Sequence, residues 1–171
     1  MKVARSYCQL STMSVAPTLG VYKLPTIDNE PMRNYEPNSK DRQELQKAVD
    51  ELLACKPFEI PVIIDGQEFR SGKLAKQVNP GDHAQAVCYY HEADERMVNI
   101  AIEGALKAKK QWMNMPWSER AAISMKAADL IAHKYRYQLL AATMVGQGKN
   151  VWQAEIDAGA EICDFLRFGV K

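Results

Sequence analysis

The second half of the sequence holds three long amphipathic stretches, but the chain offers no parallel strands to receive their apolar faces. From Ala93 onward apolar residues recur at the helical period, whereas the strands expected before that point are short and pair as hairpins. No strand–helix alternation repeats, and no apolar strand suits a sheet covered on both faces. The helices therefore either bundle with one another or cover a sheet that these residues do not contain.

Each of the three stretches has its own boundaries. The first is predicted to end at Pro116, and Ser118 is predicted to cap the second. The second has an apolar stripe from Ile123 to Ala142, about seven turns counted from its cap, and two glycines end it. Asn150 and Gln153 have the spacing of a capping pair that opens the last helix. Its predicted inward face comprises Trp152, Ile156, Ala160, Cys163 and Leu166.

Shorter elements are predicted upstream. A helix should begin near Ser39 and end at Lys56-Pro57. Asp65-Gly66 separates two runs, 62–64 and 67–69, and is a strong signal for a two-residue hairpin because both turn positions need positive φ. A second extended pair is predicted over 76–78 and 84–90.

Residues 1–27 contain no Asp or Glu and are rich in Ser and Thr. This composition is typical of a mitochondrial presequence, and a disordered tail is the alternative. Residues 28–171 are then the folded part, entered through a proline-punctuated extended segment.

Charge and length exclude several classes of protein. With 22 basic and 21 acidic side chains, the net charge of +1 gives no electrostatic attraction for nucleic acid or an acidic membrane. No apolar run approaches the roughly 20 residues that span a bilayer. By itself, a length of 171 residues fits one soluble domain.

The cysteines and histidines give no catalytic or metal site. The four cysteines, at 8, 55, 88 and 163, are dispersed and lack a CxxC pair, which favours reduced, structural thiols in an intracellular compartment. Cys88 and His91 have no second pair to complete a zinc site. Gly146–Lys149 fails the Walker A and GxGxxG patterns and is interpreted as a connector between helices.

Several segments resemble the N-terminal region of the aldehyde dehydrogenase superfamily. Val78–His83 opens the resemblance, and Ser118–Ile123 with Lys126–Ile131 continues it. Thr143–Lys149 and Asp164–Phe168, with Gln153–Ala158 between them, are more selective and resemble the branch that oxidises pyrroline-5-carboxylate. The resemblance extends from about residue 29 to the last residue. It implies an incomplete α/β fold of the aldehyde dehydrogenase type, with N-terminal hairpins and three or four amphipathic helices but no central Rossmann sheet.

The resemblance also implies a function. The family branch uses NAD to oxidise L-glutamate 5-semialdehyde, in equilibrium with pyrroline-5-carboxylate, to L-glutamate in proline catabolism. We expect the enzyme to be a homo-oligomer of the mitochondrial matrix, without nucleic-acid or membrane partners. The family's nucleophilic cysteine, oxyanion donor and NAD-binding strands lie downstream, so this chain alone is expected to be a fragment without catalytic or NAD-binding residues, and inactive. The alternative is a natural short isoform that acts as a non-catalytic interaction module, pairing with the full-length enzyme.

One site residue is carried over from the resemblance. Glu161 matches a glutamate that lies near the substrate pocket in the family, and we expect a partly buried carboxylate that binds the substrate's ammonium or iminium group. From spacing alone the alternative is a solvated charged face with an Asp164–Arg167 pair. Glu155, Asp157 and Arg167 are interpreted as structural.

Overall fold

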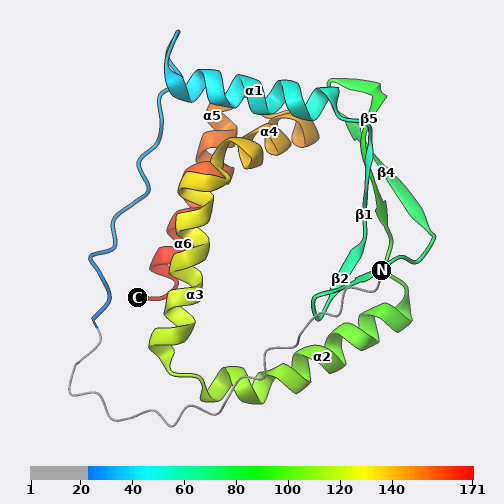
Figure 1. The fold of residues 1–171 in the computed structure, drawn as a ribbon, viewed down its shortest axis with the longest axis vertical. Coiled ribbons are helices and arrows are strands. Elements are labelled where there is room, and N and C mark those ends of the chain that lie inside the picture. The colour runs from blue at the N-terminus through cyan, green and yellow to red at the C-terminus, as the bar shows by residue number, and fades with distance from the viewer. Residues whose placement is uncertain (1–22) are drawn as a thin grey trace, which may run out of the picture.

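The elements of the chain form the sides of an open frame (Figure 1). The structure is a computed structural model and describes residues 23–171, so most of the predicted presequence or tail lies outside the described residues. Helix α1 (Lys40–Ala54) lies along one side with α4, the strands form a second side, α2 a third, and α3 with α6 the fourth (Figure 1).

The predicted hairpins are confirmed. Strand β2 (Val62–Ile64) pairs antiparallel with β3 (Gln67–Phe69), and the turn residues Asp65 and Gly66 have φ of 50° and 71°. Strand β4 (Leu74–Asn79) pairs antiparallel with β5 (Asp82–His91). Strand β1 (Phe58–Ile60) was not predicted, and it pairs in parallel with β5. No local periodicity identifies that partner, because a parallel pair joins segments distant in sequence.

Helix α1 and the helix α2 (Glu95–Asn114) begin at side-chain caps. Helix α1 begins directly after Ser39, close to the predicted start, and Ser39 Oγ accepts a hydrogen bond from the Arg42 amide. Asp94 accepts one from the Met97 amide. Each cap satisfies a backbone N–H that has no partner within its helix.

The predicted seven-turn helix is interrupted. Helix α3 (Trp117–Asp129) runs into a π-helical segment η1 (Leu130–Lys134), and α4 (Arg136–Gln147) begins only after a bend at Tyr135. The cap predicted at Ser118 is also wrong. The helix begins at Trp117, directly after Pro116, whose carbonyl accepts hydrogen bonds from the first turn. Periodicity missed the interruption because apolar spacing continues through it.

Helix α4 ends at its glycines, as predicted from the sequence. Gly148 adopts the left-handed conformation, with φ of 68°, and its amide donates to the Met144 carbonyl. A Cβ at this position would come within 3.3 Å of Pro80, so a side chain is excluded by contact as well as by conformation. The connector interpretation of Gly146–Lys149 is consistent with this geometry.

The last helix consists of three pieces. Helix α5 (Val151–Ala154) begins at the predicted capping box of Asn150 and Gln153. The π-helical segment η2 (Glu155–Glu161) follows, and α6 (Ile162–Phe168) completes it. Ala160 and Cys163 are buried as predicted, but Trp152 and Ile156 are exposed, because this helix packs along its small-residue side.

The core is small and divided. One cluster centres on Leu45, Leu140 and Ala154, and the other on Ala128, Ala132 and Cys163. An apolar stripe on α2 stays outside both clusters, and it comprises Val98, Ile102, Leu106, Trp112 and Met113. Leu106 is 63% and Met113 65% exposed. The helices thus bundle in part, and much apolar surface stays uncovered by the described residues.

Candidate functional site

Glu161, the predicted substrate-binding residue, lies at the junction of η2 and α6. Its side chain is exposed, and it makes no hydrogen bond or ion pair with any residue that the structure describes. The expectation of partial burial is therefore wrong for this chain. Phe165, one turn further, is 70% exposed, so the carboxylate stands on a surface with apolar neighbours that nothing among residues 23–171 covers. Its binding role stays a prediction.

A buried ion pair lies at the other end of η2. The side chains of Arg136 and Glu155 are both 0% exposed. The Arg136 Nη2 donates to Glu155 Oε1, and Nε donates to Oε2 at 3.3 Å. Two further groups donate hydrogen bonds to the Glu155 carboxylate: the Arg33 amide at 2.7 Å and the Tyr35 hydroxyl at 2.6 Å. Every hydrogen-bonding direction of this carboxylate is therefore used within the protein.

Glu30 extends the pair into a network. One of its carboxylate oxygens accepts from Arg136 and the other from Arg167, both at 2.6 Å. Burial alone would raise the pKa of Glu30, but the hydrogen bonds from Arg167 and Arg136 outweigh it and lower the pKa. Arg167 thus pairs with Glu30, and the alternative Asp164–Arg167 pair does not form. Asp164 instead accepts hydrogen bonds from Asn29 and the Glu30 amide.

The network fastens the N-terminal extended segment to the helices. Residues 29–35 supply donors and acceptors to α4, η2 and α6, and Arg136 also donates to the Pro31 carbonyl at 3.1 Å. Burial, followed by the neighbouring Glu155 carboxylate, raises the pKa of the Tyr35 hydroxyl, so this group stays a donor at physiological pH. Glu155 and Arg167 are interpreted as structural from the sequence, and both form hydrogen bonds that hold the extended segment to the helices.

Asp157 is the third charged residue of this region interpreted as structural. It forms an ion pair with Lys149, which follows the end of α4. Asp157 and Glu161 are like charges four residues apart on one helix, which is unfavourable, and Lys149 supplies a cation beside Asp157.

None of the three cysteines in the described part has the setting of a nucleophile. Burial raises the pKa of Cys88 and, as the largest cause, that of Cys163, so both are thiols at neutral pH. Cys55 is exposed at the C-terminal end of α1. Cys8 lies outside the described residues. The structural interpretation agrees with the burial of Cys88 and Cys163, and for Cys55 it stays a prediction.

His91 is held by the strands instead of facing a cavity. Its Nδ1 accepts from the Gly72 amide at 3.1 Å, and its Nε2 lies 2.8 Å from Glu59 Oε1. Hydrogen bonds from His91 and Arg70 lower the pKa of the Glu59 carboxyl. No cluster of three metal-ligating side chains occurs within residues 23–171, and every helix there is too short or too polar to cross a bilayer.

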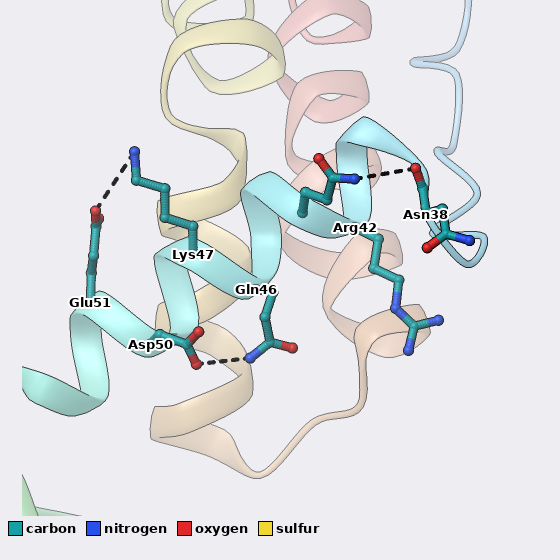
Figure 2. Close-up of a pocket in the computed structure, with 7 residues that line it drawn as sticks. Asn38, Arg42, Gln46, Lys47, Asp50 and Glu51 are labelled. Carbon is teal, nitrogen blue, oxygen red and sulfur yellow. Dashed lines mark hydrogen bonds and ion pairs between the residues drawn. The ribbon is translucent and has the colours of Figure 1, made fainter.

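The outer face of α1 carries an open depression of about 520 Å³, shown in Figure 2. Its side chains contact one another along the helix: Gln46 donates to Asp50 at 2.8 Å, and Lys47 pairs with Glu51 at 3.9 Å. These are pairs four residues apart on a solvated helix face, and none of them is positioned for catalysis.

Comparisons with known proteins identify the family of this chain. A family model described as the aldehyde dehydrogenase family matches residues 67–171. The chain belongs to the aldehyde dehydrogenase family.

The individual relatives that match this chain specify a narrower group within the family. The chain is 55% identical over 153 residues to delta-1-pyrroline-5-carboxylate dehydrogenase of Agaricus bisporus, covering 90% of this chain and 28% of the relative. It is 42% identical over 145 residues to the mitochondrial delta-1-pyrroline-5-carboxylate dehydrogenase of Homo sapiens, covering 85% and 26%. The crystal structure of the Mycobacterium tuberculosis delta-pyrroline-5-carboxylate dehydrogenase bound with NAD superposes with a TM-score of 0.85 at 37% identity, covering 90% and 29%. The chain spans little more than a quarter of these relatives, and the resemblance seen in the sequence is confirmed.

Proposed function

We propose that this chain is part of an NAD-dependent dehydrogenase that oxidises L-glutamate 5-semialdehyde to L-glutamate in proline catabolism. The observation that carries the proposal is the 55% identity with a pyrroline-5-carboxylate dehydrogenase along 90% of the chain.

The described residues do not themselves form a dinucleotide site. Such a site needs a glycine-rich turn that leads from a parallel strand into a helix N-terminus. Here the glycines at 146 and 148 lie at a helix C-terminus, where the helix dipole disfavours phosphate. NAD is proposed as the cofactor of the complete enzyme because the similar Mycobacterium tuberculosis structure is bound with NAD, and we expect residues 1–171 alone to be inactive.

Within that enzyme Glu161 is the residue of this chain that binds substrate. An exposed carboxylate without a partner among residues 23–171 can accept hydrogen bonds from an ammonium or iminium group. The surrounding exposed apolar side chains, such as Phe165 and Ile162, provide surface that the rest of the enzyme can cover. Covering would remove water and strengthen the charge–charge interaction.

We further propose a homo-oligomer in the mitochondrial matrix. The human and Emericella nidulans relatives are named mitochondrial. The acid-free, hydroxyl-rich composition of residues 1–27 supports import into that compartment.

The test compares two substrates in the complete enzyme that carries this chain. Glutamate semialdehyde has an amino group, whereas 5-oxopentanoate has the same aldehyde and carboxylate without it. Glu161→Gln is expected to lower kcat/KM, measured by NADH formation, roughly ten- to a hundred-fold for the first substrate and little for the second. Glu103→Gln, an exposed glutamate on α2, is the matched control. Equal loss on both substrates would contradict the role of Glu161, and absence of NADH formation by the parent enzyme would contradict the proposed function.

A second candidate is the non-catalytic interaction module. The observation in its favour is the exposed apolar stripe on α2, which includes Ile102 and Leu106. A module of this kind should be soluble, melt cooperatively and be retained by the immobilised full-length enzyme. Failure of that enzyme to retain the chain would contradict this candidate.

A further inference from the structure

The carboxylates of Glu155 and Glu161 stand at the two ends of one π-helical segment. A π-helix places an extra residue in each turn, and one extra residue rotates everything beyond it by about 100° around the helix axis. The face on which Glu161 stands therefore depends on how η2 is wound.

The buried end of η2 is held by several hydrogen bonds. Four donors hold the Glu155 carboxylate, and two of them, the Arg33 amide and the Tyr35 hydroxyl, come from the N-terminal extended segment. The same carboxylate packs on Gly159 of its own helix. A Cβ on Gly159 would lie 2.9 Å from Glu155 Oε2 and 3.3 Å from Leu140 Cδ1. The carboxylate fits only where this residue has no side chain.

We propose that Glu155, held by Tyr35 and Arg136, is a positioning residue that sets the direction of Glu161 through the π-helical winding of η2, and so sets the preference for a substrate that carries an amino group. The inference rests on the proposed function, because it takes Glu161 as the group that binds the ammonium. It adds a role for the extended segment, which reaches the site through Glu155 without touching substrate.

A conservative pair of variants tests the inference. Tyr35→Phe removes one donor to Glu155 and keeps the ring, while Tyr137→Phe removes a comparable hydroxyl that donates to Asp41 at 2.6 Å and does not contact Glu155. The readout is the ratio of kcat/KM for glutamate semialdehyde to that for 5-oxopentanoate, in the complete enzyme. Tyr35→Phe is expected to lower the ratio about five-fold, as loss of one hydrogen bond would, and Tyr137→Phe to leave it unchanged.

A third variant and a double-mutant cycle complete the test. Gly159→Ala is expected to lower the ratio further than Tyr35→Phe, because its methyl group must displace the carboxylate. Combined with Glu161→Gln, Tyr35→Phe should lower the ratio no further, since both changes act on one interaction. If Glu161→Gln lowers the ratio but Tyr35→Phe does not, the positioning role is overturned and the proposed function stands. If Glu161→Gln leaves the ratio unchanged, the substrate-binding role on which the inference rests fails, and the inference fails with it.

Discussion

Arg136 and Glu155 join two helices through a pair of hydrogen bonds made entirely out of contact with water, since neither side chain has exposed surface. Burial alone would lower the pKa of Arg136, but the carboxylates of Glu155 and Glu30 raise it, so the guanidinium stays charged. The pair holds α4, η2 and the N-terminal extended segment together.

Breaking this pair should be costly. Arg136→Met leaves the Glu155 carboxylate buried without its cation, and we expect a loss of roughly 3–5 kcal/mol in the free energy of unfolding. The measurement is urea unfolding of the 171-residue chain followed by circular dichroism. Lys47→Met removes one member of an exposed pair and is expected to cost less than about 1 kcal/mol. Similar costs for both variants would contradict the structural importance of the buried pair.

Acid should weaken the protein through Glu30. Its folded-state pKa is lowered by Arg167 and Arg136, so its stabilising contribution is full above the unfolded-state pKa of about 4.3 and is lost as pH falls through the folded-state value. Glu30→Gln is expected to be less stable than the parent at pH 7, and the difference should shrink below about pH 4. The measurement is the urea midpoint as a function of pH. A difference that does not change with pH would contradict the assignment.

Replacing two glycines with alanine should change the stability of the protein in opposite directions. Gly66 has a φ of 71° in the β2–β3 turn, and Gly66→Ala is expected to cost about 1 kcal/mol. Gly146 lies inside α4, where a methyl group would meet open space beyond the helix's own backbone, and Gly146→Ala is expected to stabilise by roughly 0.5–1 kcal/mol. Thermal melts of the two variants and the parent provide the comparison. Destabilisation by both would show that α4 ends before Gly146.

The apolar stripe of α2 should bind a hydrophobic dye. Leu106 is 63% exposed, so the purified chain is expected to enhance the fluorescence of an anilinonaphthalene dye, and Leu106→Lys should lower the signal. Lys107→Gln changes an adjacent exposed residue without altering the stripe and serves as the control. No enhancement by the parent chain would show that this stripe is covered in solution.

Local signals in the sequence were reliable where the partners are close in the chain. The Asp65-Gly66 turn and the Asn150–Gln153 capping box form as predicted, because each needs residues within a few positions of one another. Ser118 was assigned wrongly as a cap because Pro116, two positions earlier, already opens the helix. The π-helical segments were missed because the apolar spacing of α3, α4 and α6 stays nearly helical through them.

The candidate site was predicted unevenly. Glu161 came from the resemblance, and its expected partial burial is not found, since that depends on what covers α6. The sequence indicates that Glu155 is structural but identifies no partner for it. Its central place in the network is visible only in the structure. The signal that could have found it is a charged residue on the small-residue side of a helix, next to Gly159, where an ion needs a buried partner.

The sequence by itself determined the hairpins, most helix ends and the family resemblance, because backbone conformation, capping and motif spacing are properties of neighbouring residues. Only the tertiary structure decided that Glu30 meets Arg167 across 137 positions, and that β1 lies beside β5. Buried charges have no periodicity that names their partners, so their pairing is set by how the helices pack. The same holds for the apolar face of α2. The sequence shows that it needs a partner, and the packing of residues 23–171 leaves it open.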